Sequence, residues 1–148
     1  MDRIHQEEPL QCFKLVAIDS EGRYVSIFDG TTEYKIGETI TQEVRAGHKG
    51  GLYVCESILD LLKLGPLPSK SAMMQAPWAV VEMVGWGAKM KYNEISGGSK
   101  VAISTIVPVK FVDFPSDAKL RFLRRSRRQH ATAQRQVSAG PPCQVEAE

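Results

Sequence analysis

The chain has 148 residues, of which 43% are hydrophobic and 24% are charged, and its formal net charge is +2. This length suits one domain rather than two, and the composition is typical of a globular protein, which excludes wholesale disorder. No run of about 18 apolar residues occurs, so we expect no membrane-spanning helix.

Cysteine usage and the N-terminus indicate where the protein resides. Cys12, Cys55 and Cys143 are too few and too scattered for a disulfide framework. The first eight residues are polar and acidic and do not resemble a signal peptide. We therefore expect an intracellular protein that is not secreted, in the cytoplasm, an organelle or a virion.

The first third of the chain predicts an antiparallel meander that follows a flexible N-terminus over residues 1–9. Residues 10–18, 23–28 and 33–36 are rich in strand-forming side chains. Turn signals separate them at residues 19–22 and at Asp29-Gly30. Residues 37–51 contain four glycines and little periodicity, which predicts mostly loop.

The middle of the chain predicts a strand followed by one packed helix. Residues 52–55 are apolar, and Ser57 is a good N-cap with Asp60 three residues later as its capping-box partner. Gly65-Pro66 ends the helix, and the following residues to Pro77 form a linker.

The next segment predicts further strands. Residues 78–84 form a buried strand, Gly85-Trp86-Gly87 favours a bulge or bend, and residues 90–92 form a short strand. Gly97-Gly98 indicates a hairpin turn. One long strand follows, with alternating side chains on one face: Val101, Ile103, Thr105, Val107, Val109 and Phe111. Pro108 favours an edge position or a break. Residues 10–115 are thus expected to form an α+β domain with a mostly antiparallel sheet.

A basic helix is predicted over residues 116–136, with Ser116 as N-cap, and residues 137–148 are expected to be disordered. Residues 117–148 carry a net charge of +4, whereas residues 1–116 carry −2. The candidate partner-binding residues are the basic ones near the start of the helix: Lys119, Arg121, Arg124, Arg125, Arg127 and Arg128. Such a helix binds phosphate backbones, acidic protein surfaces or membrane headgroups, and the alternative is a solubilising extension.

Few other residues form a recognisable chemical motif. The segment from His48 to Gly51 combines basic groups with glycines, as in phosphate-binding loops, but no GxxxxGK[ST] or GxGxxG pattern occurs. Cys55 lacks the partners of a zinc site and is expected to be a buried thiol. No nucleophile, base and orienting group are recognisable together. We therefore assign no catalytic residue, metal or cofactor.

One stretch resembles a known group of proteins. The residues Tyr34-Lys35-Ile36-Gly37 and Gly51-Leu52-Tyr53-Val54-Cys55, with Asp60, resemble a pattern in small phage, bacterial and large-virus proteins of unknown function. In that pattern a histidine commonly stands where this chain has Tyr53. The resemblance implies a compact α+β fold without a settled activity.

The predicted strand–helix–strand layout is also loosely similar to ADP-ribosyltransferase-like folds, and this similarity implies NAD as a substrate. His48, Tyr53 and Glu82 are the stand-ins for their site residues. Two functions therefore stay open. The favoured one is a non-enzymatic binding or structural module of a larger assembly, whose basic helix contacts an acidic protein or nucleic acid. The alternative is an NAD-using enzyme.

Overall fold

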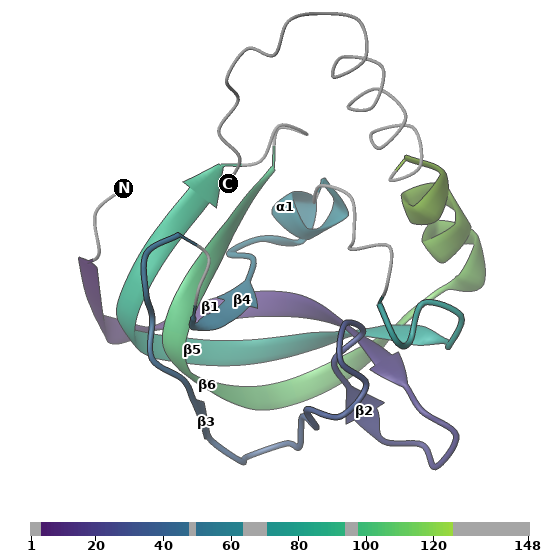
Figure 1. Ribbon diagram of the computed structural model, residues 1–148, viewed down its shortest axis with the longest axis horizontal. Helices are drawn as coiled ribbons and strands as arrows, with labels where there is room; N and C mark the ends of the chain where they lie inside the picture. The colour runs from purple at the N-terminus through teal and green to yellow at the C-terminus, as the bar shows by residue number, and fades with distance from the viewer. Residues whose placement is uncertain (1–3, 48–49, 64–70, 94–97, 126–148) are drawn as a thin grey trace, which may run out of the picture.

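The computed structural model describes residues 4–47, 50–63, 71–93 and 98–125. The elements are β1 (Ile4–Ile18), β2 (Tyr24–Val25), β3 (Ile40–Thr41), β4 (Leu52–Val54), α1 (Ile58–Leu62), β5 (Trp78–Asn93) and β6 (Ser99–Phe114). Residues 116–125 form a further helix, which we call the C-terminal helix. The expected mostly antiparallel sheet with one packed helix is confirmed (Figure 1).

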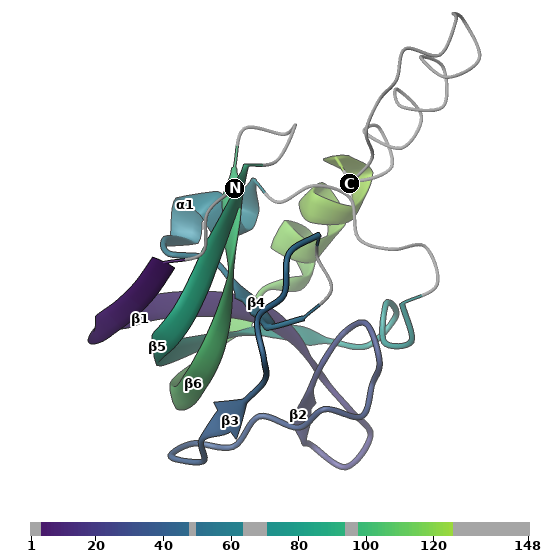
Figure 2. The same cartoon turned by 60° about the vertical axis from the view of Figure 1, so that its left-hand side comes forward.

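The long strands β1, β5 and β6 curl until the sheet nearly closes on itself (Figures 1 and 2). The strand order is β2-β1-β5-β6-β3, every pairing is antiparallel, and β4 also pairs with β6. Cys55, directly after β4, exchanges two backbone hydrogen bonds of 2.8 Å with Phe13 of β1. This bridge joins β1, β5, β6 and β4 into a closed ring of strands.

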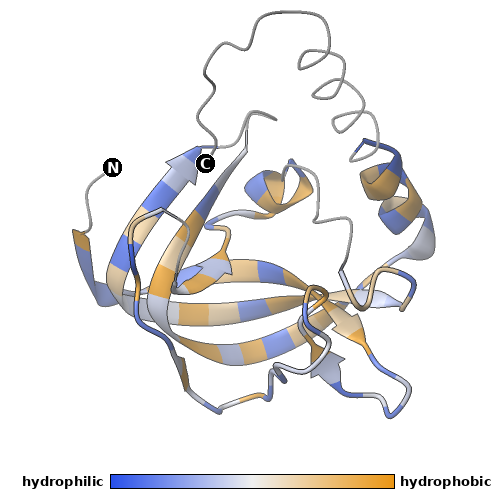
Figure 3. Cartoon of the chain, in the orientation of Figure 1, coloured by the Kyte–Doolittle hydropathy of each residue, from blue (hydrophilic) through white to orange (hydrophobic). Residues whose placement is uncertain are grey.

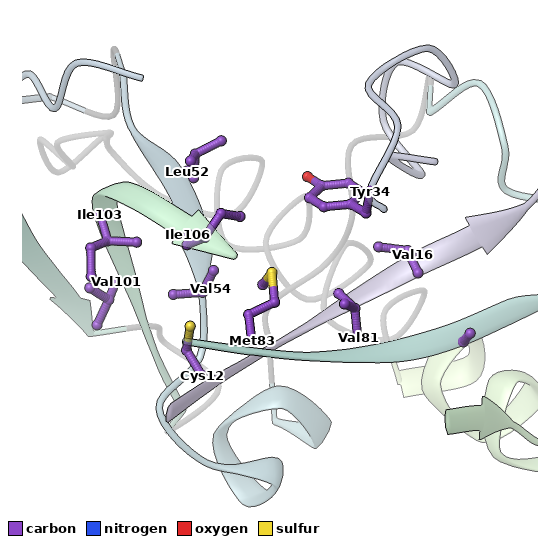
Figure 4. Packing of buried hydrophobic residues seen from close by; sticks show 11 residues of the cluster. Cys12, Val16, Tyr34, Leu52, Val54, Val81, Met83, Val101, Ile103 and Ile106 are labelled. Carbon is purple, nitrogen blue, oxygen red and sulfur yellow. The ribbon is translucent and has the colours of Figure 1, made fainter. Parts of the chain in front are cut away.

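The inside of the ring is filled by apolar side chains, which we call the inner core (Figure 4). Met83 and Cys12 lie near its centre, with Tyr34 on one side and Leu52 on the other. Its buried members are Cys12, Val16, Tyr34, Leu52, Val54, Ala79, Val81, Met83, Val101, Ile103 and Ile106. The loop that carries Tyr34 therefore contributes to the inner core.

The opposite face of the sheet carries a second apolar layer, which we call the helix-side core. Leu61 of α1 and Phe122 of the C-terminal helix join it, so both helices cover the same face (Figures 1 and 2). Hydropathy colouring shows apolar and polar residues interleaved along the strands and on both helices (Figure 3). β1 and the start of β5 thus supply alternate residues to the two layers, as the two-residue period of a strand requires.

Several predicted boundaries in the first half are wrong. β1 begins at Ile4 because β5 is long enough to pair with it, so residues 4–9 are strand rather than flexible. Of residues 23–28, only Tyr24 and Val25 are strand, and the third predicted strand is reduced to a bridge between Glu33 and Val25. Conversely, β3 lies inside the predicted loop, because Ile40 pairs with Ile106 of β6.

β5 is one continuous strand where two shorter strands were expected. The expected bulge occurs at Gly87, where the pairing with β6 slips and φ is +93°. A Cβ atom on this glycine would stand 2.1 Å from Ser104 Oγ, so only glycine fits. The strand therefore turns the corner of the ring without breaking.

β6 departs from the single alternating face expected for it. Val101 and Ile103 are inner-core residues as expected, but Ile106 follows them into the core and Val109 is 53% exposed. The ladder skips one residue beside Pro108, which pairs with Met83 and accepts a hydrogen bond from the Gly37 amide. The expected break at Pro108 is thus a register shift. The turn at Gly97 lies outside the described residues.

The N-cap of α1 is confirmed. Ser57 Oγ accepts from the Asp60 amide at 3.0 Å, and the Asp60 carboxylate accepts from the Ser99 amide at 3.2 Å, which ties α1 to the start of β6.

We expect Ser57→Ala to lower the free energy of unfolding by about 1 kcal/mol in urea denaturation, because the cap is lost. Ser20→Ala, in an exposed turn, is the matched control, and an equal loss in both variants would contradict a capping role.

Candidate functional site

The C-terminal helix has one face on the body and one in solvent. Phe122 is 4% exposed and packs edge-on against Trp78, with ring centroids 5.7 Å apart and an interplanar angle of 80°. The residues that accompany Phe122 on the packed side are half-buried, namely Ala118, Lys119, Leu123 and Arg125. The exposed side comprises Ser116, Asp117, Leu120, Arg121 and Arg124. This division follows the 3.6-residue period of a helix.

Of the basic residues predicted to bind a partner, Lys119 contacts the body and Arg125 contacts an aromatic ring of its own helix. The Lys119 amine donates to the Ala76 carbonyl and lies 4.8 Å from the centre of the Trp78 ring. The Arg125 guanidinium lies 5.0 Å from the Phe122 ring. Burial lowers the pKa of both side chains from their ordinary values. Their apolar stems extend the helix-side core while their charges meet aromatic faces.

Two other basic residues point outward. Arg124 is exposed, and Arg121 pairs with Asp117 one turn earlier at 3.2 Å, with both side chains largely in solvent. Leu120, on the same face, is 49% exposed. Such an exposed pair contributes little to stability, so it leaves the arginine available to a stronger acidic partner. Arg127 and Arg128 lie outside the described residues.

Of the stand-ins for an NAD site, Tyr53 lies in β4 and Glu82 in β5. The Tyr53 ring lies 6.2 Å from that of Tyr92 and 5.0 Å from the Lys100 amine, and burial raises its pKa to about 12. Glu82 lies elsewhere on the ring, between Phe13 and Lys110 in the sheet ladder. His48 lies outside the described residues. The structure therefore places Tyr53 and Glu82 in different surroundings.

The two glycines of the candidate phosphate loop have a packing role. A Cβ atom on Gly50 would stand 2.4 Å from the Glu43 carbonyl oxygen. Gly51 has a φ of +88°, and a Cβ there would stand 3.1 Å from the side chain of Ala102. The turn must therefore approach both neighbours closely, which accounts for the glycine pair without a phosphate.

A second candidate site lies at the seam where β4 meets β1, and it was missed from the sequence. Lys14 stands between Cys12 and Val16, which both belong to the inner core, so strand alternation directs its side chain to the same face. Its amine donates to the Tyr53 carbonyl at 2.8 Å. The side chain thus joins β1 to β4 one residue beyond the Phe13–Cys55 bridge.

The electrostatic setting of Lys14 is unusual for a lysine. Burial lowers its pKa to about 8. The interaction with Cys55 is the next largest influence and raises the pKa, Lys100 lowers it, and Asp29 and Cys12 raise it less. The neighbouring Cys12 thiol is also buried, which raises its pKa to about 12. The signal in the sequence was a single lysine inside the apolar run from Phe13 to Ile18.

The described residues hold no group of three or more metal-binding side chains. The same part of the chain contains no helix with the length and apolar character needed to cross a bilayer. In the comparisons with known proteins, no family model, no curated protein and no solved structure matches the chain.

Proposed function

We propose that this protein is a non-enzymatic binding module of a larger assembly, whose C-terminal helix contacts an acidic partner. The observation that carries the proposal is the fixed orientation of this helix. Phe122 anchors it to Trp78, and the exposed side that results carries Arg121 and Arg124 beside Leu120. A helix held in this way loses little conformational entropy when it binds, because the body has already ordered it.

The composition of the exposed face indicates the chemistry of the partner. Two guanidinium groups one turn apart match carboxylates or phosphates with paired hydrogen bonds. Leu120 adds an apolar contact that a phosphate backbone does not use but a protein surface does. We therefore favour an acidic protein surface over nucleic acid, and the two are separated by the experiment below.

We expect Arg121→Ala with Arg124→Ala to weaken binding to an acidic polypeptide about tenfold or more, because each charge-assisted hydrogen bond contributes about 1.5–3 kcal/mol. The measurement is fluorescence anisotropy of the full chain with labelled poly-glutamate and with a labelled random 20-base-pair duplex, each at two salt concentrations. If the partner is an acidic protein surface, the chain should bind poly-glutamate more tightly than the duplex. Leu120→Ala should then also weaken the binding of poly-glutamate.

The matched control is Lys35→Ala with Arg45→Ala, which removes two exposed basic side chains from the segments on either side of β3. The control should leave the affinity within about twofold of that of the unchanged chain. Equal losses in both double variants would mean that only net charge matters, and the proposal would then fail. A duplex that binds more tightly than poly-glutamate would instead identify nucleic acid as the partner class, with a salt slope of about 0.9 per phosphate contacted.

A further inference from the structure

We propose that this protein forms a twofold dimer through the outer face of its sheet, in the middle of β5 and β6. The surface, which we call the outer strip, comprises Glu82, Val84, Trp86, Val107 and Lys110. Its occupant is a second copy of this chain. The inference goes beyond the binding function of the C-terminal helix and does not depend on it.

β5 alternates between the inner core and the outside of the ring. Met83 points into the inner core (Figure 4). A Cβ atom on Gly85 would stand 3.1 Å from the Ile103 side chain, which belongs to the same core. The residues beside these two therefore project outward, namely Glu82, Val84 and Trp86.

β6 supplies the second column of the outer strip. Val107 lies opposite Val84 in the ladder, and Lys110 lies opposite Glu82. Side chains that stand directly opposite each other in an antiparallel pair share a face and lie close together. The pairing register thus gathers three apolar and two charged side chains on one outward surface.

The apolar side chains of the outer strip belong to none of the cores formed by the described residues. Val84, Trp86 and Val107 are half-buried and lie outside both the inner core and the helix-side core. Gln11 of β1 pairs with Val84 on the side away from β6 and is exposed. This part of the sheet face is therefore open to solvent.

Further apolar surface borders the outer strip. Val109, in the bulge just before Lys110, is 53% exposed. Ile36 is 58% exposed and lies beside this bulge, because the amide of the following Gly37 donates to the Pro108 carbonyl at 2.9 Å. Apolar side chains gathered in this way on a soluble surface are typical of an interaction site.

The two charges of the outer strip are left without ionic partners. Glu82 and Lys110 stand opposite each other in the ladder, yet among the described residues neither forms an ion pair. Lys110 is exposed and Glu82 is half-buried at the edge of the apolar row. Both groups are therefore available to a partner.

This arrangement of charges identifies the partner as a second copy. A twofold axis between two facing outer strips brings Lys110 of each copy opposite Glu82 of the other, while Trp86 meets apolar surface. An acidic partner would instead meet Glu82 with a like charge. The exposed side of the C-terminal helix differs in this respect, because its two arginines would repel those of a second copy.

The experiment measures the dimerisation of the full chain by sedimentation velocity over a wide range of concentration. We expect Lys110→Glu and Glu82→Lys each to weaken the dimer about tenfold or more, because like charges then face each other. An equimolar mixture of these two variants should recover the affinity of the unchanged chain as a heterodimer, since every acidic group then faces a basic one. Circular dichroism should confirm that both variants fold.

The matched control exchanges an exposed charge pair outside the outer strip. Glu43→Lys and Arg45→Glu, whose side chains are largely in solvent, should each leave the affinity of the dimer within about twofold. Val109→Asp tests the apolar border at a site too exposed to disturb folding, and it should also weaken the dimer about tenfold. Leu59→Asp, at a site 61% exposed in α1, should not.

Three results would overturn the proposal. The first is a full chain that stays monomeric at every concentration. The second is a mixture of Lys110→Glu and Glu82→Lys that associates no more tightly than either variant alone. The third is a dimer that Arg121→Ala with Arg124→Ala dissociates, which would place the contact on the C-terminal helix. None of them bears on whether that helix binds an acidic polypeptide, which is measured separately.

Discussion

Replacing Phe122 with alanine is expected to lower the free energy of unfolding by about 3 kcal/mol, which is the usual loss when a buried aromatic ring is truncated. Phe122 is 4% exposed, and its ring meets Trp78 edge-on in the helix-side core. The loss should appear in urea denaturation as a lower midpoint, with the slope of the transition unchanged.

The matched control lies on the same helix. Leu120→Ala removes a side chain that is 49% exposed and should change the stability by no more than about 0.5 kcal/mol. The same reasoning applies to a chain cut at the expected domain boundary. A chain that ends at Pro115 lacks Phe122 and the Lys119 contact with Trp78, so it should melt at a clearly lower temperature than the full chain. Equal melting temperatures would show that the helix does not contribute to the core.

Replacing Lys14 with methionine is expected to stabilise the protein at pH 7 by about 1 kcal/mol. The shift of the lysine pKa from 10.5 to about 8 corresponds to a cost of at most about 3 kcal/mol for burying the charged form. The part of the residue that still reaches solvent reduces this cost. The lost hydrogen bond to the Tyr53 carbonyl offsets about 1 kcal/mol of the gain.

The stabilisation by Lys14→Met should decrease as the pH rises. Because the folded pKa of Lys14 lies below its unfolded value, the unfolded chain binds more protons between pH 8 and 10.5, and the penalty fades as the pH rises through this window. The groups that act on Lys14 are Cys55, Lys100, Asp29 and Cys12. The raised pKa of Cys12 has the opposite consequence above pH 9, since the folded thiol keeps its proton.

The difference in free energy of unfolding between the two chains cancels the contribution of Cys12 and isolates that of Lys14. Guanidinium titrations at pH 6, 7, 8, 9 and 10 provide this difference. It should be constant up to about pH 8 and then shrink, whereas Lys14→Arg, which stays charged, should remain destabilised throughout. If this difference in free energy of unfolding stays constant from pH 6 to 10, burying the Lys14 ammonium does not carry the inferred cost.

The order of the main elements could be predicted from the sequence because it depends on local chemistry. The turn glycine Gly30 has the positive φ that its place after Asp29 predicts, and Ser57 caps α1 as the spacing to Asp60 predicts. Trp78 begins a buried strand as expected. Each of these features is decided by neighbours within a few residues, so a single sequence contains the information.

Strand lengths could not be predicted, because they depend on a partner elsewhere in the chain. Ile4 is exposed and polar residues follow it, so nothing local indicates a strand there. It is a strand because Lys89 of β5 lies opposite. Phe28 has a strong strand propensity but sits in a turn, 60% exposed, since no neighbour pairs with it.

The candidate sites divide in the same way. The sequence by itself determined that basic residues cluster after Pro115 and that Phe122 interrupts them. Only the tertiary structure decided that Lys119 contacts Trp78 while Arg124 faces solvent, since the docking angle of the helix depends on the whole helix-side core. It alone also decided the setting of Lys14, because the carbonyl that its amine meets belongs to β4, distant in sequence, and the desolvation that alters its chemistry comes from the closure of the ring.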